Sequence, residues 1–186
     1  MGGWKVPRMW DGGRCFILGG SPCLLDEPLE LIEHERCIGV NNAYELGDWV
    51  DICWFGDERW FEWNRRKLLE FGNIKACCVD KFVTQERPGV KALSRGKPQG
   101  IDKRIDHISW NNNSGFSAIN LAVHLGVKTI VLLGFAMKED DGSWDDSRGE
   151  MTREEYDAFL KCARERGPLH GERKKTEESA CSAEIK

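Results

Sequence analysis

The sequence lacks several features that would place it in a specialised class of protein. No apolar run approaches the roughly 20 residues that a membrane-spanning helix needs, and the N-terminus has no apolar secretion signal. Basic residues do not outnumber acidic ones, because 27 Lys and Arg stand against 31 Asp and Glu. With no basic field to hold a nucleic-acid backbone, we expect a cytoplasmic protein whose partner is a small molecule or a protein.

The sequence also lacks a zinc-binding pattern, since none of its eight cysteines has another at the two-residue spacing of a zinc site. Five of the cysteines lie in apolar runs: Cys15, Cys37, Cys53, Cys77 and Cys78. In the absence of a secretion signal this placement indicates reduced core thiols rather than a disulfide scaffold. We therefore predict no metal ligands.

What the sequence does contain is an alternation of short apolar runs and helical patterns. The runs predict strands at residues 14–18, 37–40, 52–56, 74–79 and 129–133. Helices are expected at about 26–34, 57–72 and 115–125, and a capping box at 152–155 predicts another. This order predicts an α/β fold, a Rossmann-like three-layer sandwich with a mainly parallel sheet. We expect one domain over residues 1–167 and a polar, disordered tail over 168–186.

In such folds ligands bind at the carboxyl ends of the strands. The residues expected there are Gly19, Gly20, Ser21 and Pro22 after the first strand, Asn41 and Asn42 after the second, and Gly134 after the last. Each group also has a structural explanation. Residues 19–22 could be only a tight turn, since they lack a full Gly-x-Gly-x-x-Gly motif, and asparagine tolerates a left-handed backbone at a strand end.

The start of the helix at residues 115–125 is a further candidate site. Asn113, Ser114 and Gly115 precede it, and unpaired N–H groups at a helix N-terminus favour a phosphate. A Cβ at Gly115 is expected to block the phosphate without unfolding the protein. The alternative is that Ser114 is an ordinary N-cap.

These motifs, in this order, resemble a Rossmann-like superfamily that contains bacterial lipooligosaccharide sialyltransferases, motility accessory factors and archaeal-type hydroxymethylpterin diphosphokinases. The likeness covers about residues 12–137 and is greatest to short proteins encoded by tailed phages and prophages. For the sialyltransferases the resemblance implies a cytidine monophosphate sugar donor. It places Gly20 and Ser21 near the donor, Asn41 on the nucleotide or sugar, and Ser114 and Gly115 on the phosphate.

The catalytic residues are less well defined. The sialyltransferases have a general-base histidine after the last strand, whereas this chain has an acidic loop without histidine at residues 138–150. Asp57 and Asp145 are the candidate catalytic residues, although Asp57 could equally cap the helix that follows it. Carboxylates at residues 139–146 could bind Mg²⁺, the one cofactor we consider, or could simply be solvated.

Three functions fit this reading. The first is nucleotide or nucleotide-sugar binding, with glycosyl transfer from a cytidine monophosphate-type donor. The second is a pterin diphosphokinase-like enzyme using ATP and Mg²⁺, for which no phosphate-binding lysine motif is found. The third is a phage-associated binding or accessory protein without catalysis.

Overall fold

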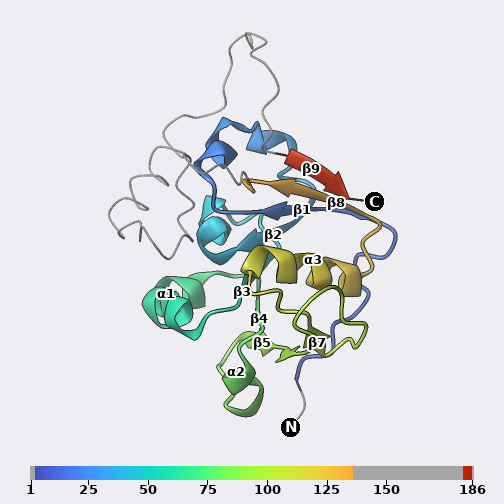
Figure 1. The fold of residues 1–186 in the computed structure, drawn as a ribbon. Helices are drawn as coiled ribbons and strands as arrows, with labels where there is room; N and C mark the ends of the chain where they lie inside the picture. Colours follow the sequence, from blue (N-terminus) through green and yellow to red (C-terminus); the bar gives the residue numbers. More distant parts are fainter. Residues whose placement is uncertain (1–2, 136–181, 186) are drawn as a thin grey trace.

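The computed structural model describes residues 3–135 and 182–185, which form an α/β fold of Rossmann-like type. A seven-stranded sheet has the order β5-β4-β3-β2-β1-β8-β9 (Figure 1). Its strands are β1 Arg14–Leu18, β2 Arg36–Val40, β3 Ile52–Phe55, β4 Ile74–Cys77, β5 Val90–Ala92, β8 Thr129–Leu133 and β9 Ser182–Ile185. All neighbours pair in parallel except β8 and β9. The predicted fold class is confirmed.

Helical segments and a small second sheet connect these strands. The α-helices are α1 Glu58–Glu70, α2 Asp80–Thr84 and α3 Ser114–Leu125, and the 3₁₀ helices are η1 Pro22–Asp26, η2 Leu29–Leu31 and η3 Asn41–Leu46. The second sheet pairs β6 Ser94–Arg95 with β7 His107–Ile108. Residues 80–108, for which the sequence analysis named no strand or helix, carry α2, β5, β6 and β7. No helix within residues 3–135 is long and apolar enough to cross a membrane.

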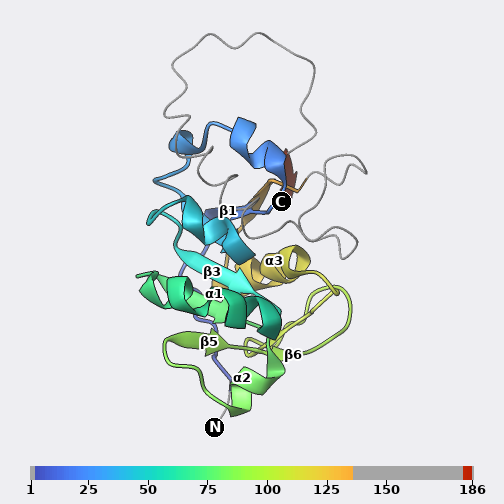
Figure 2. The ribbon, with the colours of Figure 1, turned by 90° about the vertical axis from the view of Figure 1, so that its left-hand side faces the viewer.

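Two apolar layers cover the two faces of the sheet. Alternate residues of β1 face opposite sides, so Phe16 and Leu18 belong to the core layer that contains residues of α1, while Ile17 belongs to the layer that contains residues of α3. The turned view in Figure 2 shows α1 and α3 beside the strands. Because these strands run parallel, their carboxyl ends all lie at one edge of the sheet, where the site was predicted.

The prediction of one helix at residues 26–34 is wrong. Two 3₁₀ helices, η1 and η2, replace it, and Pro28 lies between them. Glu27, just before this proline, has an extended backbone (φ −82°, ψ 142°). A residue that precedes proline is disfavoured in the helical region, which accounts for the break.

The buried face of α3 excludes two of its large apolar residues. Phe116 and Val123, which helical spacing would place on one apolar face, are 51% and 40% exposed. The side that packs on the sheet instead carries Ala118, Leu121 and Ala122. The face of α3 that packs on the sheet is therefore made of alanine and leucine.

Strand β9 lies inside the segment expected to be a disordered tail. It pairs antiparallel with β8, with Ile185 opposite Ile130 and Ser182 opposite Leu133. These four residues are therefore a sheet edge, which differs from the expectation for 168–186. The helix predicted to begin at the capping box of residues 152–155 lies outside the described residues.

Burial of the cysteines is largely as expected. Cys15, Cys37, Cys53, Cys77 and Cys78 are free and buried. Cys23, which is not one of these five, is disulfide-bonded.

Candidate functional site

The ends of β1 and β8 are joined beyond their last paired residues. The N–H of Gly19 donates to the Leu133 carbonyl (2.7 Å) and the N–H of Ser21 donates to the Gly134 carbonyl (3.0 Å). A Cβ at Gly19 would overlap the Gly134 carbonyl oxygen, and Gly134 has a left-handed backbone at φ 74°. Both glycines are therefore required for the close approach of two strands, whether or not a ligand binds here.

The turn after β1 continues through Gly20, Ser21 and Pro22. Gly20 leads to Ser21, which is 7% exposed and is the N-cap residue of η1, and Pro22 is its first residue. The Ser21 side chain makes no capping hydrogen bond, and its Oγ lies 3.2 Å from Cys23 Sγ. A contact of Ser21 with a ligand stays a prediction.

The N-terminus of α3 is capped by Asn113, not by Ser114. Asn113 Oδ1 accepts hydrogen bonds from the N–H groups of Gly115 (2.8 Å) and Phe116 (3.1 Å). The Ser114 carbonyl in turn accepts from Trp54 Nε1 (3.1 Å), which ties α3 to β3. Two donors expected to face a phosphate thus already have a protein acceptor.

Phe135 occupies the space beside Gly115. A Cβ at Gly115 would overlap Phe135 Cε1, and Phe135 Cε2 lies 3.0 Å from a Cβ built on Gly19. One aromatic ring thus fills the volume between the two glycine-containing turns. A Cβ at Gly115 would therefore require the Phe135 ring to move, and whether the protein stays folded with that Cβ stays a prediction.

Asn41 and Asn42 follow β2 and are both buried, but their side chains differ. Asn42 Oδ1 accepts a hydrogen bond from Trp60 Nε1 at 2.5 Å. Asn41 Oδ1 has no hydrogen-bond partner among the described residues, although the residue is only 5% exposed. Asn41 also has a left-handed backbone, with φ at 52°. Since a buried unpaired polar atom costs about 1–3 kcal/mol, the Asn41 side chain calls for an explanation that Asn42 does not.

The candidate catalytic residues are only partly described. Asp57 Oδ1 accepts from the N–H groups of Arg59 (2.6 Å) and Trp60 (3.3 Å), so Asp57 is the N-cap of α1. Asp145 and the acidic residues 139–146 lie outside the described residues. Within the described part of the chain no group of three His, Cys, Asp or Glu side chains could hold a metal ion.

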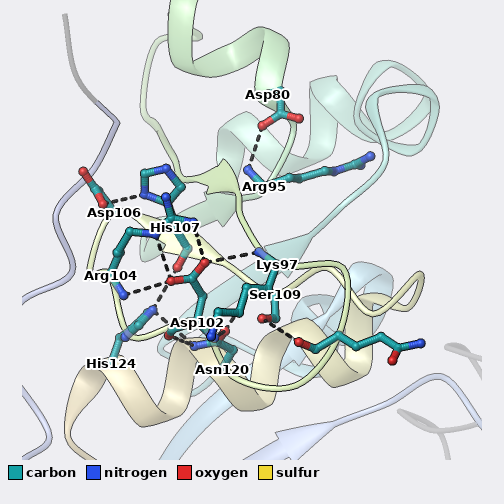
Figure 3. Close-up of polar contacts among 11 residues, drawn as sticks. Asp80, Arg95, Lys97, Asp102, Arg104, Asp106, His107, Ser109, Asn120 and His124 are labelled. Atoms are coloured by element: carbon teal, nitrogen blue, oxygen red, sulfur yellow. Dashed lines mark hydrogen bonds and ion pairs between the residues drawn. The ribbon is translucent and has the colours of Figure 1, made fainter.

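A polar network that the sequence did not reveal fixes the loop before α3. Asn120 Oδ1 accepts from the N–H groups of Asp102 and Ser109, both at 2.9 Å, from within the buried face of α3. Figure 3 shows Asn120 and His124 on this helix, facing Asp102 and Arg104 on the loop. In the sequence, the sign of this network is that Asn120 is flanked by apolar residues in a predicted helix.

The network includes one strongly stabilised carboxylate. Asp102 is 2% exposed and accepts hydrogen bonds from Arg104 Nη2 (2.6 Å) and from the N–H of Arg104 (3.0 Å). These bonds outweigh the burial of the carboxylate and hold the pKa of Asp102 well below its usual range. His124 Nε2 lies 2.9 Å from the His107 carbonyl and 3.2 Å from Asn120 Nδ2, so the histidine is part of the same network. All these contacts serve to position residues 95–113.

One cation lies at the carboxyl edge itself. The Arg95 guanidinium stacks on Trp110, 4.1 Å from the ring centroid, and donates to the carbonyl of Gly56, which directly follows β3. A Cβ at Gly56 would overlap the Trp110 ring. Glycine at position 56 therefore permits the stack.

A cavity of about 640 Å³ lies at the opposite edge, by the amino ends of β2 to β5. Its lining includes Arg36, Asp51 and Lys91. Arg36 and Asp51 already pair at 3.4 Å, and no buried polar group there is unpartnered among the described residues. We therefore place the candidate site at the carboxyl edge, where Asn41 lies.

The class of protein defined by this geometry is a Rossmann-like α/β protein with a polar carboxyl edge. Searches against protein-family models, curated proteins and solved structures give no match.

Proposed function

We propose that this protein binds a nucleotide or nucleotide-sugar at the carboxyl edge of its parallel sheet. The observation that carries the proposal is the buried, unpaired Oδ1 of Asn41 at the end of β2. In open α/β sheets the crevice outside the carboxyl ends of the strands is the usual ligand site. A ligand N–H or O–H donated to Asn41 would satisfy the amide oxygen and remove its desolvation penalty.

Binding, rather than catalysis, is what these residues support. Asp57 is engaged as a helix cap, so its position gives no separate reason to assign it a catalytic role. Transfer of a sugar from a cytidine monophosphate-type donor remains the proposed reaction for an active protein, in line with the resemblance of the four motifs. The diphosphokinase alternative gains no support from the described residues.

The test is a thermal-shift panel of cytidine, uridine, guanosine and adenosine nucleotides, with and without Mg²⁺. Stabilisation by a pyrimidine nucleotide without Mg²⁺ is the expected result, and a shift that needs both ATP and Mg²⁺ would favour the diphosphokinase instead. A flat panel would overturn both.

The variant Asn41→Gly sharpens this test. It removes the unpaired amide, and glycine accepts the left-handed backbone at this position. We expect the folded protein to persist while the nucleotide shift is lost. Asn112→Gly is the matched control, because Asn112 has nearly the same φ (51°) but an exposed side chain. An undiminished shift in Asn41→Gly would show that the ligand binds elsewhere.

A further inference from the structure

We propose that Arg95 binds a phosphate group of the ligand, an inference that rests on the nucleotide site proposed above. Arg95 lies in β6, and its backbone N–H donates to Asp80 Oδ1 at 2.7 Å. The side chain extends away from Asp80 (Figure 3). The positively charged guanidinium therefore lies at a distance from the Asp80 carboxylate that holds the Arg95 backbone.

Two backbone carbonyls fix where that charge lies. Arg95 Nε donates to the Cys78 carbonyl at 2.8 Å, and Nη2 donates to the Gly56 carbonyl at 2.5 Å. Gly56 directly follows β3 and Cys78 directly follows β4. The guanidinium consequently lies over the carboxyl ends of two neighbouring strands, on the ligand-binding edge of the sheet.

Trp110 restrains the guanidinium from one side. The ring centroid lies 4.1 Å from Arg95 Cζ, within the range of a cation–π contact. Trp110 also begins the loop that leads to Asn113 and the start of α3. A guanidinium held by two carbonyls and a ring loses little further entropy on binding an anion.

No carboxylate neutralises this guanidinium within the described residues. Its side-chain bonds through Nε and Nη2 both go to neutral carbonyls, whereas Lys81 is paired with Glu58 at 2.6 Å. Arg95 also hydrogen-bonds the Cys78 side chain, but a guanidinium has five N–H donors, so these contacts leave donors over for a ligand. An uncompensated guanidinium with donors left over matches the geometry of a phosphate, which it binds through two parallel hydrogen bonds.

The sheet register brings Arg95 and Asn41 to the same part of the edge. Val40, the last residue of β2, is paired with Trp54; Asn41 directly follows Val40, and Gly56, whose carbonyl holds Arg95, lies two residues after Trp54. One ligand can therefore offer a hydrogen-bond donor to Asn41 and a phosphate to Arg95. A phosphorylated nucleoside has both groups.

The experiment measures binding of inorganic pyrophosphate and of the nucleotide that gives the largest shift in the panel. Isothermal titration is carried out on the wild type, Arg95→Gln and Arg95→Lys, each shown to be folded by circular dichroism. Arg95→Gln is expected to weaken both ligands about 10- to 100-fold, as for loss of charge-assisted hydrogen bonds. Arg95→Lys keeps the charge without the planar fork, so a smaller loss is expected, and this variant serves if Arg95→Gln is unfolded.

Arg87→Gln is the matched control. Arg87 also stacks on an aromatic ring, 4.7 Å from the Phe82 centroid, but precedes the amino end of β5. Its substitution is expected to leave both affinities unchanged. Losses of equal size in Arg87→Gln and Arg95→Gln would indicate a nonspecific charge effect and overturn the inference.

The two proposals can fail separately. Nucleotide binding that depends on Asn41 but is the same in the wild type and in both Arg95 variants would overturn the role of Arg95 alone. Pyrophosphate binding that depends on Arg95, together with a flat nucleotide panel, would support an anion site and overturn the nucleotide function. Absence of pyrophosphate and nucleotide binding in the wild type would overturn both.

Discussion

Trp60 donates the N–H of its indole to the amide oxygen of Asn42 at 2.5 Å, and this bond separates two adjacent asparagines that look alike in sequence. Asn42 has a structural task, whereas Asn41 beside it has an unpaired oxygen. Substitution of each asparagine in turn therefore tests which one stabilises the fold and which one is available to a ligand.

Asn42→Ala is expected to lower the free energy of unfolding by about 1–3 kcal/mol, because the buried Trp60 N–H would lose its acceptor. Asn41→Gly is expected to stay within about 1 kcal/mol of the wild type, since relief of the left-handed backbone offsets the added entropy of the unfolded glycine. Urea denaturation measures both values. A large loss for Asn41→Gly would mean that its side chain holds the fold together.

Gly115→Ala is expected to destabilise the protein by about 1–3 kcal/mol through overpacking against Phe135. The reason is the overlap between the new Cβ and the Phe135 ring. The double variant Gly115→Ala with Phe135→Leu should recover part of the loss, and a double-mutant cycle by thermal denaturation measures the coupling. Additive effects would argue that the ring does not rest on Gly115.

Asp102→Asn is expected to reduce stability by about 1–3 kcal/mol at pH 7, because the charge-assisted bonds from Arg104 are weakened. The folded-state pKa of Asp102 lies below the unfolded value, so its contribution is present above about pH 4 and is lost as the pH falls through the folded pKa. The gap between the wild type and Asp102→Asn should therefore narrow in acid. Denaturation curves between pH 3 and 7 test this, with exposed Glu30→Gln as the control; a gap that does not change with pH would contradict it.

The buried thiols are expected to resist alkylation in the native protein. Burial raises the pKa of Cys37, Cys77 and Cys78 to about 12, so almost no thiolate is present at pH 8. Treatment with iodoacetamide, followed by peptide mass spectrometry, should find these residues modified only after addition of denaturant. Rapid native labelling of Cys77 or Cys78 would show that the sheet opens at β4.

Apolar runs were sufficient to locate most of the sheet. The strand expected at residues 14–18 coincides with β1, and that expected at 129–133 coincides with β8. The reason is that a strand buried on both faces must be continuously apolar. Local capping chemistry likewise located the start of α1 at Asp57, because the cap involves only residues close in sequence.

Features that depend on contacts between distant residues were not predictable in this way. Asn113 was expected at a phosphate site before α3, yet it is the helix cap, and Asn111 and Asn112 before it adopt left-handed backbones (φ 53° and 51°). The left-handed backbones and the helix cap therefore explain why asparagine occurs at these three positions. Arg95 drew no attention in the sequence, because its carbonyl partners on Gly56 and Cys78 lie 39 and 17 residues away.

By itself, then, the sequence determined the alternation of strands and helices, since periodicity and capping act over a few neighbouring residues. It therefore also determined that the carboxyl ends of β1, β2, β3 and β8 share an edge. Only the tertiary structure decided which polar groups at that edge have partners. Trp60 satisfies Asn42 and leaves Asn41 unpaired, and Phe135 fills the space beside Gly115. Hydrogen bonds and packing contacts between residues far apart in the chain determine which of these polar groups have partners.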